Sequence, residues 1–106
     1  MVSQFDVYWV DLNPTVGAEM QKTRPCVVVS PNELNDHLDT VIIVPVTSAI
    51  HGYPYRVGCR IMGRDGEIAT DQIRTIDKRR LKNRIAMLSS GEIDTLQDVL
   101  RQMFCE

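Results

Sequence analysis

The sequence has few cysteines and no long apolar segment, and both absences narrow the class of protein. Its three cysteines, Cys26, Cys59 and Cys105, are odd in number and widely spaced, with no C-x-x-C pair. This pattern argues against a disulfide framework or a zinc site and suits a reducing compartment. No apolar run approaches the ~18 residues of a membrane span. The opening residues, MVSQFDVYWV, lack the basic and apolar regions of a signal peptide. We therefore expect a cytoplasmic protein that does not enter a membrane.

Histidine is equally scarce, which bears on metal binding. The only two histidines, His37 and His51, each lie in a segment that reads as a loop. No convincing cluster of ligating residues accompanies either of them. We expect neither a metal nor any other cofactor.

Basic residues are concentrated in one part of the chain, although the net charge is only −2. Residues 1–50 have a balance of −4, whereas residues 56–84 hold nine basic residues against four acids, a balance of +5. A local basic surface matters more to phosphate binding than the overall sum does. The segment 78–84 can also be read as a solvated turn or short helix, so both readings stay open.

The chain is expected to form a single domain, residues 1–106, built mainly from short strands. Alternating or continuous apolar patterns predict strands at 5–12, 25–30, 40–47, 55–62, 67–76 and 84–88. In the first strand, Phe5, Val7 and Trp9 are expected on the apolar face. A helical turn is expected within 31–39, and a hairpin turn at GRDG, 63–66.

The end of the chain has a helical pattern instead. Ser89 and Glu92 have the spacing of an S-x-x-E capping box. Apolar residues then recur at helical spacing, namely Ile93, Leu96, Leu100, Met103 and Phe104. We predict a mostly β fold with a C-terminal α-helix packed on the sheet. A small barrel or a half-open sheet is the usual way to remove exposed strand edges.

Polar residues lie where several of these strands begin or end. Pro25 ends the segment before it and holds Arg24 in an extended or turn conformation at the mouth of a buried strand. Thr47 and Ser48 end the strand over 40–47. Asp71 is expected inside the strand over 67–76, where a carboxylate is costly unless it is paired or at a surface. Taken singly, each can be read as an ordinary turn or solvent-facing residue.

Four segments in sequence order carry a more specific signal. They are DVYWVDLNPTVGAEMQKTRPCVVVSP, VIIVPVTS, YPYRV and DQIRTIDKRRL. Their order and spacing resemble the MazF/PemK/Kid family of toxin endoribonucleases from residue 5 to about 88. The resemblance implies an SH3-like antiparallel fold of the CcdB/MazF type and a homodimer. It also implies cleavage of single-stranded RNA, such as mRNA, at short sequence motifs, and inhibition by a cognate antitoxin whose acidic, flexible tail occupies the RNA groove.

The chemistry of metal-free RNA cleavage suits this arrangement. The 2′-hydroxyl attacks the adjacent phosphorus, yielding a 2′,3′-cyclic phosphate and a 5′-hydroxyl, and negative charge gathers on the phosphoryl oxygens. A guanidinium is planar, bidentate and always charged, so we assign Arg24 an electrostatic role at the scissile phosphate. The resemblance gives Thr47 the position of a catalytic hydroxyl, which would donate a hydrogen bond or relay a proton.

The sequence departs from the Kid-type pattern at two positions. Ala18 stands where those members carry a histidine, and Ala69 where they carry an arginine. Their acid–base scheme therefore cannot be transferred whole. Asp71 could serve as a general base or as a reader of base edges, and we favour the reader. A carboxylate accepts from exocyclic amines, and Gln72 can pair with adenine edges.

Other RNA contacts are expected from the loops around the strand ends. Glu19, Gln21 and Ser48 are candidates for such contacts. Tyr55 could stack on a splayed base, a contact worth about 1–3 kcal/mol, or could be an aromatic at the edge of the core.

Two other functions remain as alternatives. The first is a CcdB-like gyrase poison with the same fold and no catalysis, acting through the end of the C-terminal helix. The second is an SH3-like binding module. Such modules present aromatic grooves, and this chain has only one Trp, three Tyr and two Phe.

Overall fold

The computed structural model describes residues 1–105, which form one curled antiparallel sheet and a C-terminal helix. The elements in chain order are β1 (Asp6–Asp11), β2 (Thr23–Val28), α1 (Asn32–His37), β3 (Thr40–Thr47), β4 (Val57–Ile61), β5 (Arg64–Ile68), the 3₁₀ turn η1 (Thr70–Gln72), β6 (Arg74–Asp77), the 3₁₀ turn η2 (Lys78–Arg80), β7 (Leu81–Met87) and α2 (Ser90–Phe104). The predicted mostly β fold with a C-terminal helix is confirmed.

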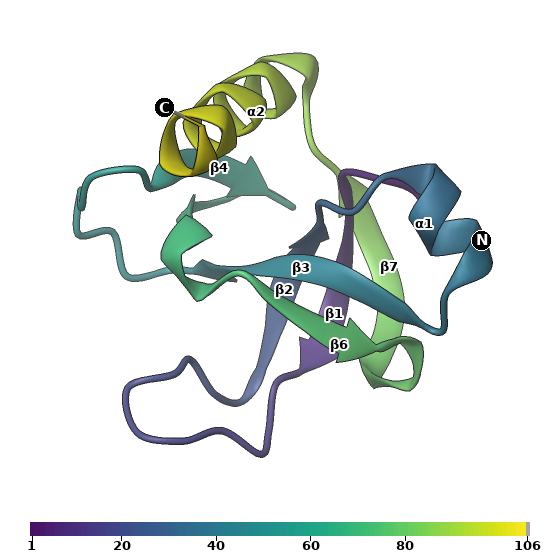
Figure 1. The fold of residues 1–106 in the computed structure, drawn as a ribbon. Coiled ribbons are helices and arrows are strands. Elements are labelled where there is room, and N and C mark those ends of the chain that lie inside the picture. Colours follow the sequence, from purple (N-terminus) through teal and green to yellow (C-terminus); the bar gives the residue numbers. More distant parts are fainter. Residues whose placement is uncertain (106) are drawn as a thin grey trace.

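The sheet has seven strands in the order β4–β5–β3–β2–β1–β7, and β6 also pairs with β3. Residues 40–43 of β3 pair with β6, while Val46 and Thr47 pair with β5. Figure 1 shows the sheet curling on itself, with α2 beside β4 at one end and the β1–β2 loop extending at the other. The result is a half-open barrel whose long loops gather around the ends of β2 and β3.

The central strands are buried on both faces, which explains their unbroken apolar sequences. Val27 and Val44 belong to the core beneath α2, whereas Val28 and Ile43 belong to a second core on the other face. Successive residues of a strand point to opposite faces, so a strand covered on both sides needs an apolar residue at every position. The strand predicted over 40–47 has the same bounds in the structure.

The first strand keeps the expected alternation. Its register with β2 is unbroken from Val7 to Asp11, so Trp9 shares the face of Val7, as predicted. Val7 is buried in the core beneath α2, whereas Val10 points to the other face and is buried in the second core. Trp9 is 38% exposed, because it lies where its face opens beside Val46 and Ile61.

The strand predicted over 67–76 is wrong as a single element. β5 ends at Ile68, residues 70–72 form η1, and β6 begins at Arg74. The break is stabilised by contacts from outside the segment, since the Thr70 hydroxyl donates to the carbonyl of Tyr55. Asp71 consequently lies in η1 and not inside a strand, so the free-energy cost expected for a carboxylate in the middle of a strand does not arise.

Some other boundaries also differ from the prediction. β2 begins at Thr23 and so includes Arg24 and Pro25, which were expected just before the strand or at its start. The β4–β5 turn lies at Met62 and Gly63, both with positive φ (52° and 78°), earlier than the predicted GRDG turn. β7 begins at Leu81, three residues before the predicted start at 84.

The C-terminal helix and its cap were predicted correctly. The Ser89 hydroxyl accepts from the Glu92 amide, and the Glu92 carboxylate accepts from the Ser89 amide. Leu96 is fully buried, but Phe104, expected on the packed face, is 64% exposed. Val99 packs against the core. Among the described helices, neither has the length and apolarity needed to span a membrane.

Candidate active site

Arg24 lies on β2, at the point where this central strand emerges from the core. The pairing of β2 with β3 ends at Cys26 and Pro45, and Arg24 and Thr47, each two residues beyond this last pair, line the same cavity. The Nε of Arg24 donates to the carbonyl of Gln21 at 2.9 Å. Within residues 1–105 the guanidinium forms no ion pair with a carboxylate. Its charge is therefore available to a ligand.

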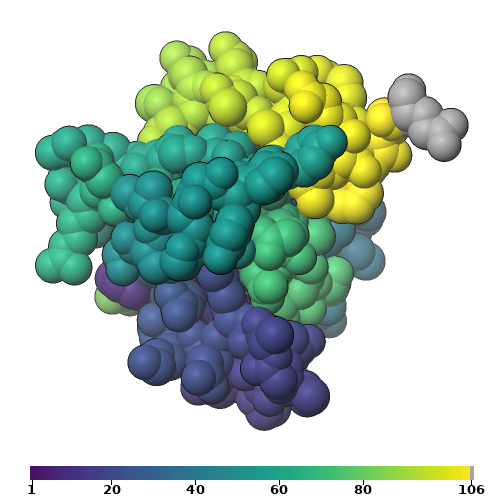
Figure 2. All heavy atoms as spheres, turned by 90° about the vertical axis from the view of Figure 1, so that its left-hand side faces the viewer, coloured from purple at the N-terminus to yellow at the C-terminus, as the bar shows by residue number. Residues whose placement is uncertain are grey.

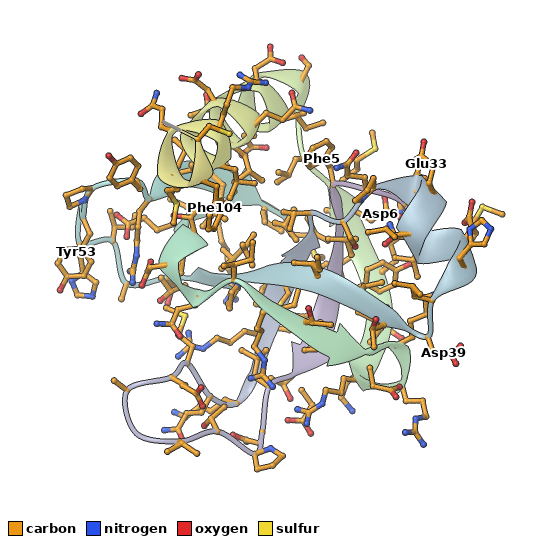
Figure 3. The ribbon with its side chains drawn as sticks, in the orientation of Figure 1. Phe5, Asp6, Glu33, Asp39, Tyr53 and Phe104 are labelled. Carbon is orange, nitrogen blue, oxygen red and sulfur yellow. The ribbon has the colours of Figure 1, made fainter. Side chains whose placement is uncertain are left out.

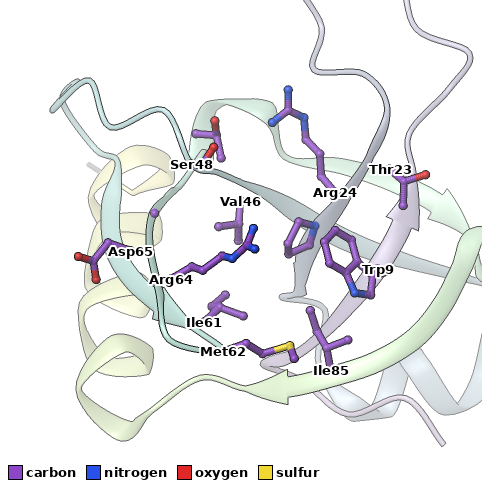
Figure 4. A pocket seen from close by; sticks show the side chains of 13 residues that line it. Trp9, Thr23, Arg24, Val46, Ser48, Ile61, Met62, Arg64, Asp65 and Ile85 are labelled. Atoms are coloured by element: carbon purple, nitrogen blue, oxygen red, sulfur yellow. The ribbon is translucent and has the colours of Figure 1, made fainter.

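A cavity of about 510 Å³ opens beside Arg24 (Figure 4). Thr47 and Ser48 line it from the end of β3, Trp9 from β1 and Arg64 from the start of β5. Figure 4 shows the Arg64 side chain reaching into the cavity between Val46 and Ile61. The cavity thus combines two guanidinium groups and three hydroxyl residues, Thr23 included, with an apolar wall.

Thr47 is the buried hydroxyl of this cavity. Its residue is only 5% exposed, and its Oγ1 accepts a hydrogen bond from the Ala49 amide at 3.1 Å. That contact uses a lone pair and leaves the hydroxyl proton free to be donated. Ser48 is exposed at the cavity rim. The structure therefore brings together Arg24, Thr47 and Ser48 among the predicted site residues.

A second cavity of about 220 Å³ contains three more predicted residues, Glu19, Asp71 and Gln72. The Gln72 side-chain oxygen accepts from the Met20 amide at 3.1 Å, which joins η1 to the β1–β2 loop. Glu19 accepts from the Val16 amide at 2.6 Å and so shapes the same loop. These contacts fix polar side chains from two distant segments around one small opening.

Asp71 is held by an arginine that the sequence reading did not connect to it. The Arg56 guanidinium donates to both carboxylate oxygens of Asp71, at 2.9 and 3.2 Å. These hydrogen bonds hold the pKa of Asp71 below its usual value. Arg56 also contacts Glu67 at 3.5 Å, and Glu67 accepts from the Gly52 amide at 2.6 Å. The nearby Arg74 does not pair with Asp71 and donates to the carbonyl of Leu12 instead.

Two predicted contacts lie outside both cavities. Gln21 is exposed on the β1–β2 loop, and Tyr55 is 49% exposed with a positive φ of 65°. Tyr53 makes the aromatic contacts of this region: its ring stacks on His51 at 4.9 Å and lies 4.9 Å from the Arg56 guanidinium carbon. Figure 2 shows this part of the chain between α2 and the β1–β2 loop, and Figure 3 shows Tyr53 at its outer edge.

The basic segment 56–84 does not form one free surface. Seven of its nine cations donate to partners within the molecule, namely Arg56, Arg60, Arg74, Lys78, Arg79, Arg80 and Arg84. Arg64 and Lys82 have no such side-chain contact within residues 1–105, and only Arg64 reaches the cavity of Arg24. The sequence analysis did not connect Arg64, Arg56 or Trp9 to these sites, because each meets them through residues that are distant in the chain.

No metal site accompanies these groups in the described part of the chain. Residues 1–105 contain no group of three or more His, Cys, Asp or Glu side chains placed to hold a metal ion. The charged residues that line the larger cavity are Arg24, Arg64 and Asp65, and Asp65 pairs with Arg60.

The family is decided by the match to known proteins. A family model described as PemK-like, MazF-like toxin of type II toxin–antitoxin systems matches residues 3–104. The chain belongs to this toxin family. The resemblance found in four sequence segments is confirmed, and the match to PemK/MazF toxins weighs against the two alternative functions.

Individual relatives agree with this assignment to the PemK/MazF family. The Endoribonuclease MazF of Staphylococcus epidermidis is 32% identical over 108 residues, covering 93% of this chain and 90% of that protein. A crystal structure of MazF from Deinococcus radiodurans superposes with a TM-score of 0.87 at 25% identity, covering 99% of this chain and 97% of that one. A mycobacterial endoribonuclease in complex with its cognate antitoxin shares the fold, with a TM-score of 0.81 at 21% identity and coverage of 96% and 93%.

Proposed function

We propose that this chain is an endoribonuclease that cleaves single-stranded RNA at the cavity beside Arg24. The observation that carries the proposal is an open cavity lined by both the buried hydroxyl of Thr47 and the guanidinium of Arg24, which pairs with no carboxylate of residues 1–105. The named relative and the family support the same activity. The reaction class is attack of the 2′-hydroxyl on the adjacent phosphorus, with departure of the 5′-oxygen.

Arg24 acts on the charge of the transition state. As the 2′-oxygen bonds to phosphorus and the bond to the 5′-oxygen breaks, negative charge gathers on the phosphoryl oxygens. A donor that is already in place meets this charge without reorganising, which is usually the largest catalytic effect. The single hydrogen bond from Nε to Gln21 orients the side chain and leaves the two terminal nitrogens for the phosphate.

Thr47 supplies a neutral hydrogen bond beside this cation. Its oxygen is fixed by the Ala49 amide, so the hydroxyl proton can point into the cavity. We propose that it donates to a phosphoryl oxygen or relays a proton to the leaving oxygen. Ser48, at the rim, contacts the RNA strand.

The second cavity is proposed to read a base next to the cleaved bond. Asp71 and Glu19 are acceptors for exocyclic amines, and Gln72 presents an amide that can both donate and accept. Asp71 lines this cavity rather than that of Arg24, and its lowered pKa makes it a weaker base. Both points support the reader role over the general-base role. Gln21 and Tyr55 are proposed to contact RNA on the exposed loops.

The partners follow from the same family. We propose that an antitoxin with an acidic, flexible segment inhibits the chain by covering the two free guanidinium groups of the larger cavity, Arg24 and Arg64. Antitoxin complexes of relatives support this partner. We also propose a homodimer acting in the cytoplasm. The reaction needs no metal ion or other cofactor, because Arg24 supplies the positive charge.

The function is tested on purified protein and a defined RNA, in excess EDTA. We expect cleavage to persist and the fragments to carry 2′,3′-cyclic phosphate and 5′-hydroxyl ends. Activity that is lost in EDTA and restored by a divalent metal would contradict the metal-free reaction. An absence of cleavage, with inhibition of DNA gyrase instead, would support the CcdB-like alternative. Sequencing of fragment 5′ ends identifies the cleaved motif.

A further inference from the structure

We propose that Arg64 binds a second backbone phosphate of the RNA, next to the phosphate that Arg24 meets. The inference rests on the proposed function and adds a residue to the same cavity. It is carried by three observations: the position of Arg64, the absence of a partner for its charge, and the packing that holds its strand against Thr47.

The position of Arg64 is fixed by a tight strand connection. Met62 and Gly63 have positive φ values of 52° and 78° and turn the chain directly into β5, which starts at Arg64. Ile61 and Arg64 are paired across β4 and β5. The side chain thus starts from a strand end rather than from a mobile loop, and it extends into the cavity (Figure 4).

Close packing at Gly66 brings β5 against the backbone of Thr47. A Cβ atom at Gly66 would lie 2.8 Å from the carbonyl oxygen of Thr47 and 3.3 Å from Val46. Only glycine allows β5 to approach β3 this closely. Arg64 is two residues from Gly66, so it is on the same face of β5 as Gly66. That face borders the cavity that Arg24 and Thr47 also line.

The charge of Arg64 is not used inside the protein. Its neighbour Asp65 also lines the cavity, but that carboxylate pairs with Arg60 at 3.3 Å and points away in Figure 4. Arg64 itself forms no hydrogen bond or ion pair with any side chain of residues 1–105. An unpaired guanidinium in a cavity suits a phosphate, which it can contact with two parallel hydrogen bonds.

Two cations on separate strands define a direction for the RNA. Arg24 is on β2 and Arg64 on β5, and the cavity spans the gap between them. RNA carries one phosphate per nucleotide, so a strand bound at Arg24 can bring a flanking phosphate to Arg64. Such a contact positions the strand without touching the reacting atoms. Arg64 is therefore expected to affect RNA binding more than turnover.

The test compares Arg64→Gln with Lys82→Gln, which removes an equally unpartnered charge outside the cavity. RNA with a 2′-deoxy nucleotide at the cleavage site remains uncut, so binding can be measured alone. A neutral methylphosphonate is then placed at one phosphate at a time.

For the wild type, neutralising one flanking phosphate should weaken binding by about ten-fold. Arg64→Gln should bind about ten-fold more weakly and lose its sensitivity at that phosphate only. The slope of the logarithm of its RNA-binding constant against the logarithm of the salt concentration should be smaller in magnitude by about 0.7. Lys82→Gln should match the wild type in affinity and in its sensitivity to each methylphosphonate.

An Arg64→Gln variant that keeps the full wild-type sensitivity profile would overturn the inference. Arg64→Lys keeps the positive charge and should retain most of the sensitivity, which separates loss of charge from loss of folding. If the wild type cleaves RNA and the Arg64 variants behave like it, the inference alone is wrong. If the wild type neither binds nor cleaves RNA, the proposed function is wrong and the inference with it.

Discussion

Arg24 is held in place by a backbone carbonyl, and no acidic side chain of residues 1–105 pairs with it. We therefore expect Arg24→Ala to lower the turnover number by about 10²–10³, because one pre-placed donor is lost from the transition state. The melting temperature should change little, since the side chain contributes one hydrogen bond at the surface. Single-turnover cleavage of a short RNA and a thermal melt measure the two effects. Cleavage at a near wild-type rate would show that Arg24 does not meet the scissile phosphate.

Thr47 offers a cleaner test of a single hydroxyl. Thr47→Val keeps the shape of the side chain and removes the proton that is free to be donated, so turnover should fall more than RNA affinity does. The substitution also frees the Ala49 amide, and Thr47→Ser is the matched control because it keeps the hydroxyl. If turnover is unchanged in the valine variant, Thr47 is structural and Ser48 becomes the candidate.

Asp71→Asn separates the possible roles of this carboxylate. The amide keeps the size but adds a donor where there was only an acceptor, so preference at one RNA position should shift by roughly ten-fold or more. A general base would instead lose activity by ~10²–10⁴ at every site alike. Loss of thermal stability with unchanged cut sites would mark Asp71 as a brace for Arg56 only. A fragment-end profile, a rate and a melting curve distinguish these outcomes.

At the scale of elements, Arg56 links the loop before β4 to β5 and η1. It lowers the pKa of Asp71, and with the Gly52 amide it lowers the pKa of Glu67. Lowered carboxyl pKa values stabilise the fold above the unfolded-state values near about 4, and this stability is lost as the pH falls through the folded-state values. The destabilisation caused by Arg56→Met should therefore be larger at about pH 6 than at about pH 3.

Thermal melts over this pH range provide the measurement. Lys82→Met removes a charge that has no partner within residues 1–105, so its effect on the melting temperature should not follow the same pH dependence. If Arg56→Met lowers the melting temperature equally at every pH down to about pH 3, Arg56 stabilises the fold by packing rather than by its contacts with the ionised carboxylates of Asp71 and Glu67.

The elements that the sequence predicted well are those determined by local pattern. β3 is buried on both faces and reads as one apolar run, and α2 carries its own cap at Ser89 and Glu92. η1 was missed because it is held by contacts to Tyr55 and Arg56, about fifteen residues away in the chain. No glycine or proline marks that break.

The candidate site was predictable to a similar extent. Arg24 and Thr47 were proposed from the family motif, and the structure adds that they line one cavity. Arg64 could not be singled out among nine cations until the partners of seven of them, and the place of the cavity, were known. Trp9 was placed on the apolar face, but its position at the open end of that face, where it lines the cavity, leaves no mark in a single sequence.

The position of the two cavity guanidinium groups has a consequence for the encounter of the whole molecule with RNA. The net charge is −2, and acids such as Glu33 and Asp39 lie on the α1 side (Figure 3), whereas Arg24 and Arg64 face one cavity. The molecule measures 32 × 30 × 28 Å, several times the screening length of about 8 Å at physiological salt. Charges more than a screening length away therefore act only weakly on a polyanion that has reached the guanidinium groups. The association rate constant for RNA should fall as salt is added, despite the negative overall charge of the protein, because the local positive charge of the cavity attracts the strand.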